Sequence, residues 1–343
     1  MIDSLAGSRA VATPKDVSRL IEAGHVLIVA GEEATLSQLP AGRWIGGTTA
    51  WFLLPDGVGP AQGRLIYTDL TGIARHAALF AFDETELPHL STFYPPHGFA
   101  VLLLPGRSAL LERVATSMLD WDGLYNAPLT GWVSGVALEA LGQSTPKIFC
   151  GNGTPHDDRA ALLYVTLPNE LYPELSVINP FGVGAGPGIV FPDRGYASAG
   201  LCRIGGETMR LRAFLDQAVA DPGLPLIADR DGALVNNTIL NPGAAQEAVE
   251  FLCPLDPGLM YRFAEPLPAY EAAFARAARD LDLAGAVLSA LCIGSLRHLT
   301  AEMRRHLPAI APVTFGQIGY TVLTQTLTCL NIHRLDEPAA QSK

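Results

Sequence analysis

The sequence predicts an α/β (α+β) protein of two lobes, with mixed, partly antiparallel sheets flanked by helices. Short apolar runs alternate with amphipathic segments, and their order is irregular rather than a strict strand–helix–strand series. Hydrophobic residues make up 49% of the chain, which is enough to bury a large core. Because single cores seldom grow beyond ~250–300 residues, the length of 343 residues favours two lobes.

The first half begins with a clearly marked helix. Thr13 is placed to cap it, Pro14 suits its first position, and Gly24 is suited to end it. A second amphipathic helix is expected over 108–119. Buried strands are predicted around these helices, at 25–30, 44–50, 64–70, 77–82, 99–104, 147–150 and 161–167.

The stretch 168–187 is rich in Pro, Gly and Asn, and it marks the expected boundary between the lobes. Residues 1–170 would form the N-terminal lobe, 171–335 the C-terminal lobe, and 336–343 a disordered tail. In the second lobe, strands are predicted at 188–191, 196–204, 224–228, 233–240, 284–293 and 323–333. Helices are predicted at 243–251, 269–281 and 295–307.

Charge and hydropathy narrow the function classes. The net charge of -11 disfavours binding to nucleic acid, because a phosphate backbone repels an acidic surface. No run of ~18 apolar residues predicts a membrane span. The start of the chain has no apolar segment typical of a secretory signal. The five cysteines are far apart and include no CxxC pair, which favours reduced thiols and a cytoplasmic location.

No motif assigns a catalytic or metal-binding residue. The serine-nucleophile pattern GxSxG is absent. His156 is followed by Asp157 and Asp158, a group that either forms an exposed turn or contributes to a metal site. Cys292 precedes Gly294 at an expected strand-to-helix turn, where a thiol is either buried structurally or faces a ligand.

Several short segments, taken in order, are similar to motifs of the FIST family, an intracellular sensory domain of signal transduction. WIGGTTA at 44–50 resembles the family's first strand and its small-residue turn, and GWVSGVA at 131–137 resembles its glycine turn. SALCIGS at 289–295 is similar to the strand that ends in SCxGR. FGQIG at 315–319 and TQTLT at 324–328 are similar to the closing turn and strand.

Three positions depart from the family pattern. Ser295 stands where the family has arginine, Gln317 where it has an acidic residue, and Thr324 where it has part of a His-Asn pair. These are polar positions that are suited to touch a ligand. Their substitution implies either a different ligand or a lost one.

The resemblance implies a cytoplasmic protein that binds a small ligand, amino acids being the ligands proposed for the family. Because no kinase or cyclase module is visible, the output is expected to reach a signalling protein in trans, with no nucleic acid or membrane as partner. The ligand would lie between the lobes, held by glycine turns and polar side chains. These expected ligand-binding residues are Gly46, Gly47, Thr48, Gly131, Trp132, Cys292, Gly294, Ser295, Gln317 and Gln325.

Two alternatives remain open at this point. A subset of the family resembles haem-binding nitric oxide sensors, so haem held by one of the eight histidines is possible, although no cofactor is predicted. The other alternative is an enzyme of unrecognised mechanism. It would need convergent titratable residues, for example Cys292 with a histidine.

Overall fold

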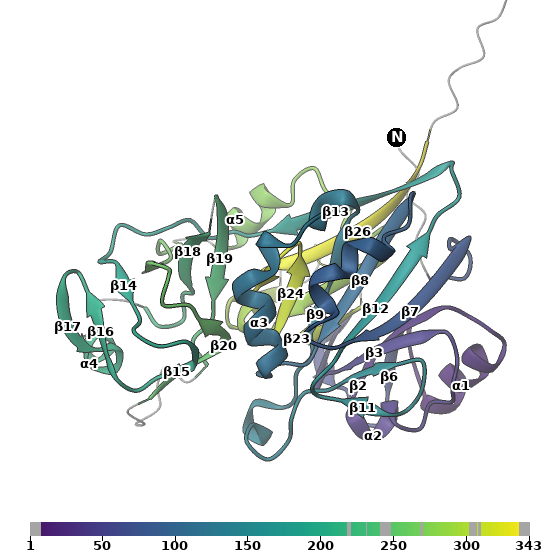
Figure 1. The fold of residues 1–343 in the computed structure, drawn as a ribbon, viewed down its shortest axis with the longest axis horizontal. Coiled ribbons are helices and arrows are strands. Elements are labelled where there is room, and N and C mark those ends of the chain that lie inside the picture. The colour runs from purple at the N-terminus through teal and green to yellow at the C-terminus, as the bar shows by residue number, and fades with distance from the viewer. Residues whose placement is uncertain are drawn as a thin grey trace, which may run out of the picture.

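The computed structural model describes residues 8–217, 221–230, 232–240, 248–267, 270–301, 307 and 310–335, and the expected tail at 336–343 lies outside them. The fold is α+β with mixed sheets, which confirms the predicted fold class. A main body contains three six-stranded sheets, and a smaller, strand-rich lobe projects from one end of it (Figure 1).

The main body repeats one arrangement of strands three times. Each unit supplies an outer strand, a parallel pair, a hairpin and a return strand. In unit 1 these are β1 (Ser8–Ala12), β2 (Leu27–Gly31), β3 (Trp44–Thr48), β4–β5 (Trp51–Leu54, Gly57–Pro60) and β6 (Leu65–Asp69). In unit 2 they are β7 (His76–Phe82), β8 (Gly98–Leu104), β9 (Leu129–Val133), β10–β11 (Ile148–Cys150, Pro155–His156) and β12 (Ala160–Thr166). In unit 3 they are β13 (Leu171–Ile178), β22 (Leu288–Cys292), β23 (Ala311–Thr314), β24–β25 (Gly316–Gly319, Val322–Leu323) and β26 (Leu327–Arg334).

Each unit gives its hairpin to the sheet of another unit. The β10–β11 hairpin pairs with β3, β24–β25 pairs with β9, and β4–β5 pairs with β23. The units are joined again beside these hairpins, by the hydrogen bonds Gly135 N to Thr48 O, Phe315 N to Val133 O and Thr49 Oγ1 to Val313 O. The expected boundary at 170/171 falls between units 2 and 3, yet two sheets contain strands from both sides of it.

The inner faces of the three sheets meet in one apolar core, to which Ile28, Val101 and Leu330 contribute from units 1, 2 and 3. Each outer face is covered by a helix that packs its own apolar side chains there. We number each sheet after the unit that supplies its parallel pair of strands. The covering helices are α1 (Pro14–Glu22) on sheet 1, α3 (Ala109–Ser117) on sheet 2 and α5 (Tyr270–Ala277) on sheet 3. Central strands such as β8 are buried on both faces, which explains their continuous apolar sequence.

The helix punctuation predicted at the start of the chain is confirmed. The side chain of Thr13 accepts a hydrogen bond from the Asp16 amide at 3.3 Å, and Pro14 is the first residue of α1. Val17 and Ile21 form its buried face. Local residues alone therefore decide this helix.

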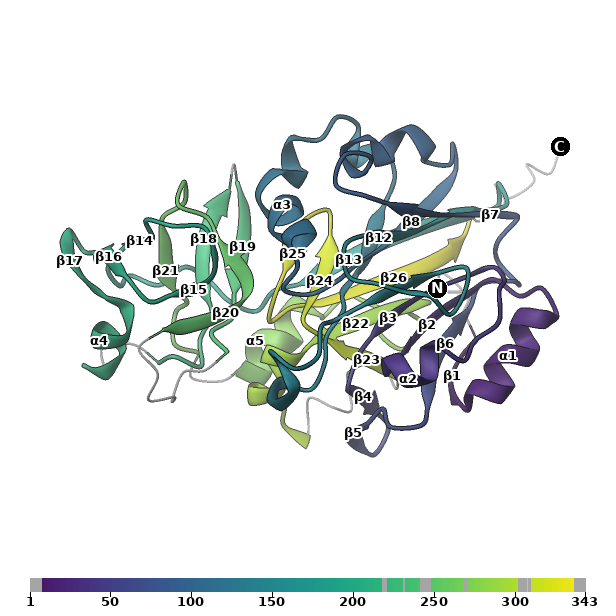
Figure 2. The same ribbon diagram turned by 60° about the horizontal axis from the view of Figure 1, so that its bottom comes forward.

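The inserted lobe, residues 181–267 as far as they are described, lies between β13 and α5 and has its own core (Figure 2). Its larger sheet contains β14 (Ile189–Val190), β16 (Leu201–Ile204), β17 (Glu207–Arg210), β18 (Leu226–Arg230), β19 (Ala233–Asn237) and β21 (Tyr261–Phe263). A second sheet pairs β15 (Gly195–Ser198) with β20 (Val249–Leu255), and α4 (Leu211–Asp216) follows β17.

Three sequence predictions are corrected. The helix expected at 243–251 is wrong at its end, where the strand β20 forms instead. The cause is burial on both faces of β20, since Phe251 belongs to the core of the inserted lobe and Leu252 to that of unit 2. Residues 241–247 lie outside the described part of the chain. The expected boundary loop contains the edge strand β13, which accommodates Pro173. At 295–307 only a short 3-10 helix, η5 (Ile293–His298), is described, and 302–306 are not.

Candidate functional site

Cleft I is a cavity of about 310 Å³ where units 1 and 2 meet. It lies beyond the carboxyl ends of β2 and β3, and is lined there by Glu32, Glu33, Thr48 and Thr49. Its opposite wall is the segment 135–144, which contains the short 3-10 helix η4 (Leu138–Ala140). The carboxyl ends of parallel strands are a common place for ligands, because neighbouring connections diverge there and leave a crevice.

The local sequence fixes the shape of cleft I. The short helix α2 (Glu33–Leu36) connects β2 to β3 and brings two carboxylates to the rim. Lys147 forms an ion pair with Glu33 at 2.9 Å, and its backbone amide donates to Thr48 Oγ1 at 2.9 Å. The Gly135 amide donates to the Thr48 carbonyl at 2.8 Å. Both ends of the 135–147 segment are therefore held against the end of β3.

Five of the expected ligand-binding residues belong to units 1 and 2, and of these only Thr48 lines the cleft. Gly46 and Gly47 are buried within β3, and Gly131 and Trp132 within β9. A Cβ atom on Gly47 would lie 2.5 Å from Ser134 Oγ and 2.8 Å from the indole nitrogen of Trp132. This glycine is therefore required for the close approach of sheets 1 and 2.

Gly131 is required for another reason. Its φ of +147° is a backbone conformation that side chains disfavour, and an added Cβ would lie 1.9 Å from the carbonyl oxygen of Leu102. The glycine turn that the resemblance emphasised is thus a position inside the sheet of unit 2, where no larger residue fits.

The other five expected residues gather at the unit 3 junction, where β22, β24 and β26 meet the inserted lobe. A Cβ on Gly294 would lie 2.8 Å from Gln325 Cγ and 2.9 Å from the side chain of Thr238 in the inserted lobe. Gln317 is fully buried, and its amide lies 3.1 Å from Thr314 Oγ1 and 2.8 Å from Thr326 Oγ1. The close approach at Gly294 packs the inserted lobe onto unit 3, whereas the Gln317 contacts lie within unit 3.

The junction also contains polar atoms with unmet hydrogen-bonding capacity. Ser295 Oγ and Gln325 Oε1 are buried and have no hydrogen-bond partner of good geometry within the described part of the chain. Both residues line a cavity of only about 10 Å³. Gln325 has a φ of +51°, which is uncommon for a residue other than glycine. His298 stacks on Tyr270 with ring centroids 4.7 Å apart, and burial lowers its pKa. The space suffices for about one water molecule.

Cys292 is fully buried at this junction. Burial raises the pKa of its thiol. Its sulfur accepts from the Gly294 amide at 3.4 Å and lies 4.0 Å from the Phe315 carbonyl oxygen. Among the described residues no histidine hydrogen-bonds to this sulfur, so the cysteine–histidine pair that an enzyme would need is not formed there. Within the same residues, no three His, Cys, Asp or Glu side chains converge as metal ligands.

Cleft II, a cavity of about 290 Å³, lies on the other side of the 135–147 segment. It is lined by the turn between β8 and α3, including Arg107 and Ser108, and by Ser144, Thr145 and Asp157. Ser144 borders both clefts. Of the charged residues of the two clefts, the sequence drew attention only to Asp157, as part of either an exposed turn or a metal site. The clue available was that Glu32-Glu33 and Gly106-Arg107-Ser108 each follow directly after an apolar strand.

No helix in the described part of the chain is both long and apolar enough to cross a membrane.

Comparison with family models gives a match over residues 12–333, to a family of unknown function, DUF6976. The chain belongs to this family. No curated protein matches the chain. The match extends from the last residue of β1 into β26 and includes the inserted lobe. The resemblance to FIST stays a prediction.

Proposed function

We propose that this protein is a cytoplasmic sensory protein that binds a small ligand in cleft I and acts on a signalling partner in trans. The observation that carries the proposal is the position and composition of cleft I. A cavity of about 310 Å³ is within the size range of small-molecule sites, and it lies beyond the ends of two parallel strands.

The lining indicates the class of ligand. Glu32 and Glu33 place carboxylates on one side, hydroxyl groups of Thr48 and Ser144 lie on the rim, and small apolar residues such as Ala137 cover the remaining wall. Carboxylates suit a ligand that carries an amino group, because hydrogen bonds to a charged partner are the stronger ones. The proposal is therefore a small, amine-bearing metabolite.

The two alternatives are supported less well. No histidine is among the described residues that line cleft I, cleft II or the junction cavity, so nothing described favours an axial haem ligand there. Haem binding through another histidine stays a prediction. The enzyme alternative lacks the convergent pair at Cys292 among the described residues.

A thermal-shift screen of small amines, followed by calorimetric titration of any hit, tests the proposal. Glu32→Gln is expected to weaken binding by about tenfold or more, since it removes a charged acceptor. Ala137→Trp is expected to abolish binding by filling the cleft. Glu139→Gln is the matched control, because Glu139 is exposed on the same segment and does not line the cleft. Equal affinity in all three variants would contradict the proposal.

A further inference from the structure

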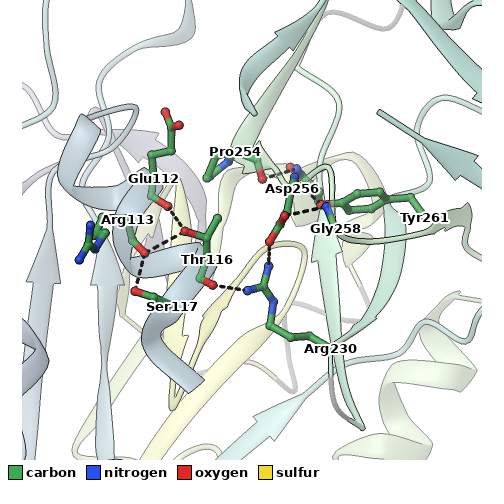
Figure 3. A network of polar contacts seen from close by, with 10 residues as sticks. Glu112, Arg113, Thr116, Ser117, Arg230, Pro254, Asp256, Gly258 and Tyr261 are labelled. Carbon is green, nitrogen blue, oxygen red and sulfur yellow. Dashed lines mark hydrogen bonds and ion pairs between the residues drawn. The ribbon is translucent and has the colours of Figure 1, made fainter. Parts of the chain in front are cut away.

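Helix α3 holds the inserted lobe at both of its ends. Before its first turn, the Ser108 carbonyl oxygen accepts a hydrogen bond from the Tyr196 hydroxyl at 2.8 Å. Near its last turn, the Thr116 carbonyl oxygen accepts from Arg230 at 2.6 Å, and Arg230 also pairs with Asp256 at 2.6 Å (Figure 3). Contacts along this helix therefore hold the lobe in addition to those at the unit 3 junction, such as the hydrogen bond between Thr238 and Thr324.

Arg107, in the turn that precedes α3, also contacts the inserted lobe. Its guanidinium forms an ion pair with Glu250 of β20 at 3.2 Å and donates to the Phe251 carbonyl oxygen at 3.0 Å. It also lies over the ring of Tyr196, 5.3 Å from the centroid. The backbone of Arg107 has a φ of +54°, a sparsely populated region for such a residue, so the turn holds it in an unusual conformation.

The same arginine lines cleft II. Its neighbours in the cleft are the hydroxyl-bearing residues Ser108, Ser144 and Thr145 and the carboxylate of Asp157. The guanidinium and the hydroxyl groups of Ser144 and Thr145 suit an oxyanion, which arginine binds through paired hydrogen bonds. The Ser108 hydroxyl already donates to the Pro105 carbonyl oxygen at 2.8 Å. Asp157 favours an oxyanion that carries a hydrogen-bond donor of its own, such as hydrogen phosphate, because a carboxylate can only accept.

We propose that cleft II binds a small oxyanion that competes with the Glu250 carboxylate for Arg107 and thereby loosens the inserted lobe from α3. The protein would then have a second ligand site, distinct from cleft I. Binding of the oxyanion at this site would change how firmly the lobe is attached to α3. Because Arg107 contacts both the cleft and the lobe, the oxyanion and the Glu250 carboxylate compete for the same guanidinium, and each weakens the binding of the other.

Calorimetric titration with inorganic phosphate, at an ionic strength held constant with sodium chloride, tests the binding step. Arg107→Gln is expected to weaken phosphate binding tenfold or more. Glu250→Gln is expected to tighten it by about two- to fivefold, because it removes the competing carboxylate of a partly exposed pair. Arg113→Gln is the matched control, since Arg113 carries the same charge on the adjoining helix α3 but pairs with exposed Glu84.

Hydrogen exchange tests the coupling. Phosphate is expected to speed the exchange of the amides of β20 in the wild-type protein, and to have no such effect in Arg107→Gln. If that variant fails to fold, the tightening in Glu250→Gln decides the matter. The proposal is overturned if phosphate shows no saturable binding, or if Glu250→Gln binds it no more tightly than the wild-type protein. Unchanged exchange in β20 at saturating phosphate would overturn the coupling.

Discussion

Cleft I and the unit 3 junction occupy the same place in the repeated unit, yet one is open and the other is closed. Both lie beyond a parallel pair of strands, β2 and β3 in unit 1 and β22 and β23 in unit 3. At cleft I the space stays open and is bordered by charged side chains. At the junction the inserted lobe packs onto the strand ends, with Thr238 against Gly294, and leaves about 10 Å³.

The difference shows that the same strand arrangement serves binding or assembly according to what covers it. Residues at the junction are buried and joined to one another by hydrogen bonds, so changes there should mainly affect stability. At cleft I, Glu32, Glu33 and Ala137 are partly exposed, so changes to them should mainly affect ligand binding. The expected effect of a substitution on stability therefore falls from the junction to cleft I.

Gly294→Val should cause the largest loss, about 3 kcal/mol, at the upper end of the usual range for overpacking. The added side chain would meet Gln325 and Thr238, neither of which can move without breaking the junction. Urea denaturation measures the change. Gly186→Val is the control, because a Cβ at Gly186 meets nothing within 4 Å. Equal stability of the two variants would show that the junction is loosely packed.

Thr324→Val should lower the free energy of unfolding by about 1–2 kcal/mol. The Thr324 hydroxyl donates to the Asn236 carbonyl oxygen and lies 2.9 Å from Thr238 Oγ1, so valine leaves buried groups unpaired. In a double-mutant cycle, Thr238→Val should lower the free energy of unfolding less in the Thr324→Val background than in the wild-type protein. Strictly additive losses would mean that the two hydroxyls do not interact across the junction.

His298 should make the junction sensitive to acid. Burial lowers its pKa below the ordinary value of 6.5, with Tyr270 stacked on the ring and Arg297 and Asp221 as the charged groups near it. Between that lowered pKa and about 6.5, the imidazole binds a proton more readily in the unfolded chain than in the folded one. The free energy of unfolding therefore rises with pH in this window. Stability is then lost as the pH falls through the folded pKa.

The measurement is the free energy of unfolding between pH 5 and pH 8. His298→Gln should flatten the slope in this window, whereas His89→Gln, which removes an exposed histidine, should leave it unchanged. A slope that survives the loss of His298 would assign the acid sensitivity to other groups.

Lys147→Met should have the smallest effect on stability, below about 1 kcal/mol. The Lys147–Glu33 pair is partly exposed, with 43% of the Glu33 side chain accessible, so water already screens it. Because it releases Glu33 toward the cleft, the variant should change ligand affinity more than stability. A stability loss larger than that of Thr324→Val would reverse the comparison between the two regions.

Local features of the fold were predictable from the sequence, whereas its assembly was not. The Thr13-Pro14 helix start and the apolar strand at 99–104 follow from neighbouring residues, and both are confirmed. The exchange of hairpins depends on distant partners, such as Trp51 beside Val313, which no local pattern reveals. The threefold repeat is hidden for the same reason, since it is repeated in strand pairing and not in residue identity.

The candidate site shows a similar limit. The glycines chosen from the sequence mark positions where backbones approach closely, as Gly47 and Gly131 do inside their sheets. A glycine in the sequence is equally compatible with the close approach of a ligand and with that of a neighbouring strand. The Glu33–Lys147 ion pair at cleft I joins residues 114 positions apart in sequence and emerges only when units 1 and 2 assemble.

The most direct test of the central claim is hydrogen exchange mapped along the chain, with and without a small amine found in the screen. If the ligand occupies cleft I, protection should be confined to the amides near 32–36, 48–50 and 135–140. The amides of 293–298 and 324–326 should be unaffected. Protection of the unit 3 junction with none at cleft I would contradict the proposed function, and would return the ligand to the residues that the FIST resemblance placed there.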